Sequence, residues 1–492
     1  MRRTGPPVAS CSGPSSRRSR EGTSLTSDLL APLDLAFWNI ESAEHPMHLG
    51  ALGVFACHSP TAGAHAADLL AARAAGVTGL RMRIRDVWLP GGGAGAGGAA
   101  GLARAGARLP LAFGGAAREP APDFDPLDHV RLHAPTDDFH AVAGRLMQRP
   151  LVRGRPPWEA HVLPGEDGTS FAVLFKFHHA LADGLRALTL AAAIMDPTEL
   201  PPSRPRPVEA GRSRFGAFPF PDPRRLPGLV RGALSGVVSD VGRALDIGAS
   251  VALSTLGVRS SPALTAGPTG TRRTAGVVLD LDEVHRVRKT AGGTVNDVLI
   301  AVVAGALRRW LDERGDGSEG VAPRALIPVS RRRPRSASPQ GNRLSGYLIR
   351  LPVDEADPLR RLRVVRAAMD RNKDAGPGRG AGAVALLADH VPALGHRLGG
   401  PLVSQAARLW FDILVTSVPL PSLGLRLGGS PLVEVFPLAP LARGQSLAVA
   451  VSTYRGRVHY GLVADAEAVP DLAGFAAAIH DELDALRRAC DA

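Results

Sequence analysis

The chain has 492 residues, of which 45% are hydrophobic, 21% charged and 4% aromatic, and 58 basic against 46 acidic side chains give a formal net charge of +12. This length suits about two to four domains, and the composition excludes a charge-rich disordered chain. Three cysteines (Cys11, Cys57 and Cys490) stand far apart, which excludes a disulfide scaffold and indicates a reducing compartment. We find no membrane-spanning run and no signal peptide, so the expected location is cytoplasmic.

The positive charge is concentrated in two segments without acidic residues. Residues 1–20 hold five Arg, and residues 321–350 hold seven. Neither segment has the interleaved aromatic side chains or the reading motif typical of nucleic-acid binding, so we expect no nucleic-acid partner. The remaining interpretations are a solvated tail and a basic surface that meets the phosphates of a ligand or of a membrane.

The first half of the chain begins with a basic tail, residues 1–25, whose Ser, Pro, Gly and Arg content predicts disorder. Apolar and alternating runs predict strands at 48–57, 80–89, 158–163 and 170–177, and helical spacing predicts helices at 66–75, 137–147 and 185–195. The glycine-rich stretch 91–101 lacks the Lys of a phosphate-binding loop, and we interpret it as an insertion.

A linker at 201–270 separates the two halves. It is rich in Pro and Arg, and its residues 229–257 have apolar side chains at the spacing of an amphipathic helix. After it, strands are predicted at 275–281, 326–329, 344–353, 413–418, 433–436, 447–454 and 457–464, and helices at 295–311 and 472–488. This alternation predicts two α/β (α+β) domains, 26–200 and 271–492, with a cleft between them.

One short segment combines several chemically active side chains. The predicted strand 170–177 leads into His178 and His179, and Asp183 and Gly184 follow just before a helix. Adjacent residues leaving a strand point in opposite directions, so one histidine can face a cleft and the other the interior. Asp183 stands where a helix N-cap is expected, and Gly184 suits a tight turn.

Three interpretations of this segment stay open from the residues alone. In the first, both histidines satisfy buried polar groups and Asp183 is only a cap. A metal site needs further ligands, and adjacent histidines that point apart cannot chelate one ion together, so we expect no metal. In the third, a histidine acts as a general base, because its proton affinity suits proton transfer near neutral pH.

The segment HHALADG at 178–184 resembles the HHxxxDG motif of the CoA-dependent acyltransferase superfamily, which includes chloramphenicol acetyltransferase and the condensation domains of peptide synthetases. Seven further segments resemble, in order, those of the bacterial wax ester synthase/diacylglycerol acyltransferase family. They are PLDLAFWNIES (32–42), PMHLGALGVF (46–55), DFDPLDHVRLHAP (123–135), PLVRGRPPWEAHVLPG (150–165), TVNDVLIAVVAGALRRWL (294–311), GNRLSGYLIRLPVDEADPLRRL (341–362) and GQSLAVAVSTYRGRVHYGLVAD (444–465). The resemblance implies two chloramphenicol-acetyltransferase-like domains with a cleft and tunnel between them.

The same resemblance implies acyl transfer from acyl-CoA to an alcohol. The acceptor would be diacylglycerol, giving triacylglycerol, or a long-chain alcohol, giving a wax ester. His179, the second histidine of the motif, would be the general base that takes the proton of the acceptor hydroxyl and then protonates the leaving thiolate. His178 completes the motif, Asp183 would hold the loop, and Gly184 would permit its turn.

Further residues follow from the resemblance. Asn296 and Asp297 match the family's Asn-Asp pair at the head of a helix, where Asn296 would donate near the developing oxyanion or position the base, with a helix cap as the alternative. Acyl-CoA is a substrate, so no cofactor is expected. Its phosphates would meet the basic segment, with Arg331, Arg332 and Arg333 as candidates and anionic lipid as the rival ligand.

Two other functions stay open: a non-catalytic lipid-binding protein on the same fold, and a condensation-type acyltransferase with another acceptor. Trp158 is expected in the core. Pro157, Ser417 and Leu420 replace the Leu, Asn and Gly of the family pattern, which bears on the acceptor more than on the reaction type. Greasy substrates suggest an enzyme at the surface of a membrane or a lipid droplet.

Overall fold

The computed structural model describes residues 29–87, 115–197, 260–330, 344–375, 410–418, 420 and 424–492. Several predictions concern segments outside these residues. They are the tail 1–25, the glycine-rich stretch 91–101, the amphipathic helix 229–257, and Arg331, Arg332 and Arg333. These remain predictions, and the architecture below concerns the described residues alone.

The first sheet has six strands in the order β11-β12-β1-β6-β5-β4. They are β1 (His48–Ala56), β4 (Val130–Leu132), β5 (Trp158–Pro164), β6 (Ser170–His178), β11 (Arg426–Leu427) and β12 (Ser430–Leu438). Strand β4 runs parallel to β5, and the other neighbours are antiparallel. One face packs against α2 (Ala62–Ala74) and α6 (Gly184–Ala192) in a core that includes the fully buried Trp158, as expected.

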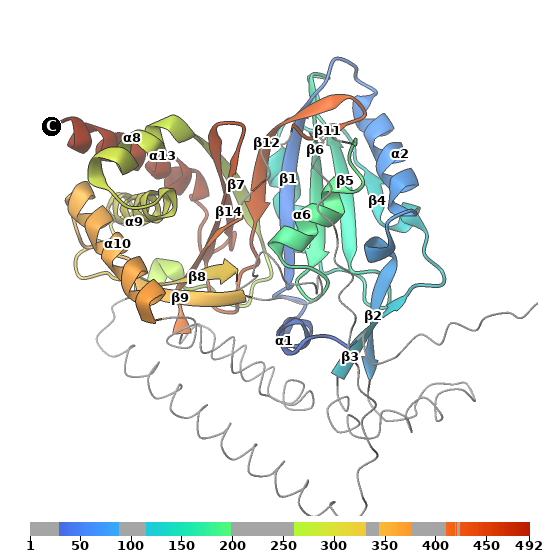
Figure 1. Ribbon diagram of the computed structural model, residues 1–492, viewed down its shortest axis with the longest axis horizontal. Helices are drawn as coiled ribbons and strands as arrows, with labels where there is room; N and C mark the ends of the chain where they lie inside the picture. The colour runs from blue at the N-terminus through green and yellow to red at the C-terminus, as the bar shows by residue number, and fades with distance from the viewer. Residues whose placement is uncertain are drawn as a thin grey trace, which may run out of the picture.

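The second sheet also has six strands, in the order β7-β14-β13-β10-β8-β9. They are β7 (Arg273–Asp280), β8 (Arg324–Ser330), β9 (Leu344–Arg350), β10 (Ile413–Ser417), β13 (Leu447–Tyr454) and β14 (Arg457–Ala464). Its outer face packs on four helices, which are α8 (Leu281–Ala291), α9 (Val295–Glu313), α10 (Pro358–Ala375) and α13 (Leu472–Asp491). In Figure 1, α8, α9, α10 and α13 lie on one outer side and α2 lies on the other, with strands of both sheets between them.

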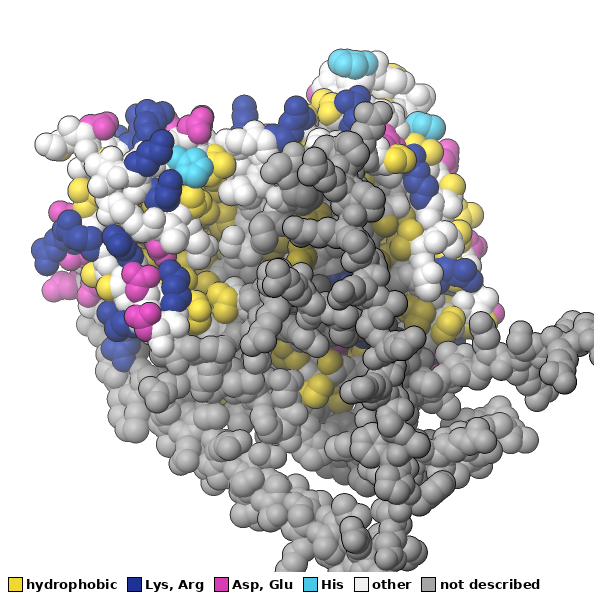
Figure 2. Space-filling view, viewed as in Figure 1, with side chains coloured by type: hydrophobic (Ala, Val, Ile, Leu, Met, Phe, Trp, Pro, Cys, Tyr) yellow, Lys and Arg dark blue, Asp and Glu magenta, His cyan; other side chains and the backbone are white. Residues whose placement is uncertain are grey.

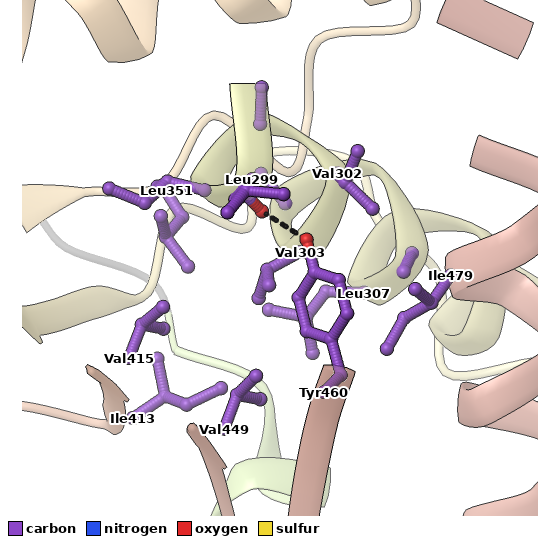
Figure 3. Packing of buried hydrophobic residues seen from close by; sticks show 14 of the residues in the cluster. Leu299, Val302, Val303, Leu307, Leu351, Ile413, Val415, Val449, Tyr460 and Ile479 are labelled. Carbon is purple, nitrogen blue, oxygen red and sulfur yellow. Dashed lines mark hydrogen bonds between the residues drawn. The ribbon is translucent and has the colours of Figure 1, made fainter. Parts of the chain in front are cut away.

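Helix α9 is the centre of the second core. Its apolar side chains are buried almost all round, because α8, α10 and α13 surround it on the sides that the sheet leaves open. A capping box between Thr294 and Asp297 starts the helix. Figure 3 shows Leu299, Val303 and Leu307 packed around Tyr460, whose hydroxyl donates to the carbonyl oxygen of Leu299 at 3.1 Å.

Replacing Tyr460 by phenylalanine is expected to lower the free energy of unfolding by about 1 kcal/mol, because the ring still fills the core and only the hydrogen bond to Leu299 is lost. Denaturant unfolding measures the change. The variant Tyr460→Ala is expected to lose about 3–5 kcal/mol, since it leaves a cavity. A Tyr460→Phe loss as large as that of Tyr460→Ala would contradict this assignment.

The two halves of the chain exchange structure across the predicted boundary at residue 271. Strand β12 comes from the second half but pairs with β1 in the first sheet, where Figure 1 shows it in orange beside the blue β1. In the other direction, α5 (Phe139–Met147) of the first half packs on β7. The segments 26–200 and 271–492 therefore do not each form one sheet, because the first sheet is completed by the second half.

The seam between the two sheets depends on two glycines. Gly276 and Gly461 are paired neighbours on β7 and β14. A Cβ at Gly461 would lie 1.8 Å from the carbonyl oxygen of Pro437 in β12, and one at Gly276 would lie 2.6 Å from the ring of Phe436. At Gly461 the backbones of the two sheets approach this closely because the side chain is absent, and at Gly276 the absent side chain leaves room for the ring of Phe436.

Most predicted elements are present, but several short or charged ones escaped prediction. These are α1 (Pro32–Ile40), β3 (Gly115–Pro120), β4, α8, α10 and β11, together with the short helices η1 (Thr78–Arg81), η2 (Pro126–Asp128) and η4 (Pro262–Leu264). The predicted strand 80–89 is β2 (Met82–Val87), which forms a separate hairpin with β3. Charge masks the apolar stripe of α10, and β4 is too short for a periodic signal.

Charged side chains over the helices of the second core alternate in sign. In Figure 2, blue and magenta groups lie side by side over α8, α10 and α13. Ion pairs there include Arg487–Glu283 at 2.7 Å and Lys373–Asp370 at 3.1 Å. Within the described ranges no single helix is both long enough and apolar enough to cross a bilayer. Helices α8 and α9 reach that length and hydropathy only together, and the pair is bent by 99°.

Candidate active site

The motif at 178–184 lies at the end of a central strand of the first sheet. Strand β6 stands between β1 and β5 and ends at His178, and α6 begins at Gly184. In register, His178 faces His48 of the neighbouring β1. The buried strand fixes the direction in which the two histidines leave the sheet, so their environments differ.

His178 is buried, and both of its ring nitrogens have neighbours. Its Nδ1 accepts a hydrogen bond from the N–H of Ala180 at 3.0 Å, and its Nε2 lies 3.3 Å from Oε1 of Glu41. The edge of its ring meets Trp38 with centroids 5.0 Å apart. Burial opposes ionisation of Glu41, but His178, the N–H of Met47 and the charge of Arg153 outweigh it and lower the carboxyl pKa to about 2. His178 therefore supports the loop that carries its neighbour.

His179 is partly exposed and is held differently. Its ring stacks on Phe37 of α1 with centroids 4.1 Å apart and planes 15° apart, and its N–H donates to the carbonyl oxygen of Met47 at 2.9 Å. Burial of the ring and then the neighbouring His178 lower its pKa from 6.5 to about 4, although Asp183 acts in the opposite direction. The imidazole is therefore neutral at pH 7 and able to accept a proton.

Asp183 and Gly184 close the motif. Asp183 is buried and caps α6, since its carboxylate accepts from the N–H of Arg186 at 2.8 Å, as the sequence predicts. The prediction that Gly184 serves a tight turn is wrong, because the φ of this residue lies outside the left-handed region that favours glycine. A Cβ there would instead lie 3.4 Å from Val418 of the second half, so Gly184 lies where the two halves meet.

Asn296 and Asp297 lie at the head of α9, in the helical layer of the second sheet. Asp297 is buried and accepts from both the N–H and the hydroxyl of Thr294, each at 2.8 Å, as the N3 member of the capping box that Thr294 opens. Asn296 is partly exposed. Among the described residues no hydrogen bond or ring contact joins either of them to His179, so an oxyanion or positioning role of Asn296 remains a prediction.

Sequence reasoning missed the residues that surround the motif. They come from α1 and its C-terminal side and from the hairpin: Asp34, Phe37, Trp38, Glu41 and Arg118. Arg153 lies over the ring of Trp38, 4.2 Å from its centroid, and contacts Glu41 at 3.2 Å. The sequence does show an acidic residue, Glu41, close to the aromatic pair Phe37 and Trp38. Nothing in the local pattern, however, relates these residues to a motif about 140 residues away.

Replacing His178 by leucine is expected to lower the free energy of unfolding by about 1–3 kcal/mol. The Ala180 N–H and the Glu41 carboxylate would then lose a buried partner. Denaturant unfolding measures the effect. The exposed His58 supplies the control, because His58→Leu is expected to change stability by less than about 0.5 kcal/mol. Wild-type stability of His178→Leu would show that these contacts contribute nothing.

Two hollows in the described part of the chain bear on the expected cleft and tunnel. One of about 290 Å³ is lined by Gly424, Leu425, Arg426, Pro431 and Arg455. A smaller one, large enough for about one water, includes His48, Met147 and Arg272. Neither is lined by His179, so the tunnel remains a prediction.

The geometry defines a class of protein. Two mixed sheets joined by an exchanged strand, with an HHxxxDG motif at the end of a central strand, make up a fold that this chain shares with two solved acyltransferases. A wax ester synthase/diacylglycerol acyltransferase from Marinobacter aquaeolei VT8 aligns with a TM-score of 0.64 at 20% identity over 94% of this chain and all of its own. The trichothecene 15-O-acetyltransferase TRI3 from Fusarium sporotrichioides aligns with a TM-score of 0.58 at 10% identity, covering 93% and 94% of the two chains.

The sequence comparisons identify the family. The model described as the wax ester synthase/diacylglycerol acyltransferase catalytic domain matches residues 30–94 and 101–299, and the model of the WS/DGAT C-terminal domain matches 340–487. This chain belongs to the wax ester synthase/diacylglycerol acyltransferase family, and it is an O-acyltransferase. The unmatched residues 95–100 fall inside the glycine-rich stretch, in agreement with its interpretation as an insertion.

Curated relatives carry diacylglycerol acyltransferase names. A putative diacylglycerol O-acyltransferase of Mycobacterium bovis is 30% identical over 482 residues, which cover 94% of this chain and 99% of the relative. The probable diacylglycerol O-acyltransferase tgs1 of Mycobacterium tuberculosis is 30% identical over 375 residues, covering 73% and 79%. The Mycobacterium bovis relative matches both halves of the chain, including the strand that the halves exchange.

Proposed function

We propose that this protein transfers the acyl group of an acyl-CoA to the hydroxyl of diacylglycerol, of a long-chain alcohol, or of both. The relatives named for diacylglycerol and the family named for both products support these acceptors. The observation that carries the chemistry is the contrast between the two histidines. In the interior, His178 accepts a hydrogen bond at Nδ1 and its Nε2 lies 3.3 Å from the Glu41 carboxylate. His179 is partly exposed, neutral and stacked on Phe37.

In the proposed reaction, the neutral His179 removes the proton of the acceptor hydroxyl as its oxygen attacks the thioester carbonyl. The tetrahedral intermediate collapses, the carbon–sulfur bond breaks, and the imidazolium of His179 returns the proton to the departing CoA thiolate. The products are the ester and free CoA. Direct attack needs no nucleophilic side chain, and the step balances without cofactor or metal.

The low pKa of His179 gives a pH prediction. Because the pKa falls from 6.5 to about 4, the base form is present throughout the range above about pH 5. We expect kcat/KM to show no acid limb near 6.5 between pH 5 and 8, with stability checked at each pH. A limb at about 6.5 that tracks His179 would contradict the lowering of its pKa by partial burial of the ring.

The decisive test is CoA release with one acyl-CoA and a panel of acceptors, with diacylglycerol and hexadecanol as the first two, followed by chromatography of the lipids. We expect triacylglycerol, wax ester or both. Binding of lipid without CoA release from any pair would favour a non-catalytic lipid-binding protein. Activity confined to other acceptors, such as amines, would favour a condensation-type enzyme.

Both acceptors dissolve in lipid rather than in water. We therefore include in the proposal that the enzyme works at a membrane or lipid-droplet surface, with attachment from one side.

The basic segment with Arg331, Arg332 and Arg333 would meet the CoA phosphates. Charge reversal of these three residues tests this point through the KM for acyl-CoA, which is expected to rise while kcat is retained.

A further inference from the structure

A small separate core lies against the motif. It joins α1, the β2–β3 hairpin and the motif through six buried side chains, Leu30, Leu35, Trp38, Ile84, Ala116 and Ala180. The segment before α1 is attached to the hairpin as well, since the N–H of Leu30 donates to the carbonyl oxygen of Ala116 at 2.8 Å. In Figure 1, α1 and the hairpin lie together at the lower end of the first sheet.

Arg118 of β3 is the polar link across this core. Its partner in register is Ile84, so both project from the face of the hairpin that packs on α1. Its Nη2 donates to Oδ2 of Asp34 and to the carbonyl oxygen of Ala180, each at 2.6 Å. The side chains of Arg118 and Asp34 are only 14% and 1% exposed. Charge-assisted hydrogen bonds are strong in such shielded surroundings.

Ala180 follows His179 directly, and the backbone on both sides of it is fixed. Its N–H donates to His178, and its carbonyl accepts from Arg118. The N–H of His179 is held by Met47. Three hydrogen bonds therefore restrain the loop that carries His179. The one from Arg118 comes from the β2–β3 hairpin, because Arg118 lies 62 residues before Ala180 in the sequence.

We propose that Arg118 is a positioning residue that holds His179 in the orientation for proton transfer, acting through the carbonyl oxygen of Ala180. The proposal rests on the proposed function, because it takes His179 as the base. Nη2 carries two hydrogens in the fixed plane of the guanidinium and can donate one to each acceptor. Misplacing a catalytic group by about 1 Å costs about 10²-fold in rate.

The test compares two arginines of one hairpin in the CoA-release assay. Arg118→Met is expected to lower kcat about 10- to 100-fold, with the KM for acyl-CoA changed less than about twofold. Arg118→Lys is expected to restore part of the loss. Arg83→Met is the control, because Arg83 pairs with Glu119 at 2.7 Å on the opposite face of the hairpin, and wild-type kcat is expected.

A pH profile separates positioning from general support of the fold. The wild type is expected to be flat between pH 5 and 8. In Arg118→Met the released His179 gains water contact, so the acid limb of kcat/KM is expected to move up toward 6.5. A residue that only stabilises the fold would lower the melting temperature and leave the profile of the folded enzyme unchanged.

In Arg118→Met, Asp34 would lose its ion pair with Arg118, which endangers folding. The double variant Asp34→Asn/Arg118→Met also removes the charge of the buried carboxylate and is expected to show the same loss of kcat. Wild-type kcat in either folded variant, an equal loss in Arg83→Met, or an unchanged pH profile would overturn the proposal. Failure of the proposed function is distinguishable, since it would appear as undiminished CoA release in His179→Ala.

Discussion

Replacing His179 by alanine is expected to lower CoA release about 10²–10⁴-fold, the usual contribution of a general base. The loss should fall on kcat, because no ground-state contact with acyl-CoA depends on this ring in the proposed reaction. The measurement is release of CoA with diacylglycerol or hexadecanol as acceptor. His179→Gln is expected to lose as much, since its amide keeps a polar side chain beside Phe37 without a basic nitrogen.

The control for this prediction is His58→Ala, which removes an exposed histidine far outside the motif sequence and should keep wild-type activity. His179→Ala and His58→Ala should both retain the wild-type melting temperature to within a few degrees. The loss at His179 is small because this residue contributes only one partly exposed stacked ring. Full activity of a folded His179→Ala would remove His179 from the mechanism. His178 is not a substitute in that case, because its nitrogens are directed to Ala180 and Glu41.

Replacing Gly461 by alanine is expected to lower the free energy of unfolding by about 3 kcal/mol or more. A Cβ at this position would lie 1.8 Å from the carbonyl oxygen of Pro437 and 2.8 Å from its carbonyl carbon. These atoms are backbone of β12, which pairs with β1 over six residue pairs and cannot move without disturbing the first sheet. The single methyl group therefore forces the two sheets apart.

Gly267 offers a matched control for that change. A Cβ there meets nothing within 4 Å and its φ lies outside the left-handed region, so Gly267→Ala is expected to alter stability by less than about 0.5 kcal/mol. Thermal and denaturant unfolding of the two variants give the comparison. Equal stability of Gly461→Ala and the wild type would mean that β14 and β12 can move apart at this point without loss of stability.

Local pattern was enough for the strongest elements. The apolar run of β6, the helical stripe of α9 and the alternation along β13 and β14 each bury one or both faces, and burial leaves a periodic trace in the sequence. Helix α10 escaped because six basic residues interrupt its stripe, although Leu362, Val365 and Met369 are buried. Strand β3 escaped because Gly115–Pro120 owes its structure to pairing with β2.

The sequence by itself determined the chemistry available at 178–184, the capping role of Asp183 and the family to which the motif order points. It also predicted that the two histidines point in opposite directions, because alternation is a property of the strand backbone. Only the tertiary structure decided which histidine is enclosed and which is partly exposed. That choice depends on α1 and Glu41, which meet the motif from about 140 residues away.

Tertiary structure also decided the contents of each sheet. Strand β12 joins β1 although nearly 400 residues separate them, and Arg118 reaches the Ala180 carbonyl from a separate hairpin. Hydrogen bonds between strands and buried ion pairs depend on distance in space, and a linear pattern records only which face of each element is apolar. The residues proposed to perform the chemistry could be named from the sequence, and the residues that contact them became visible only in the folded chain.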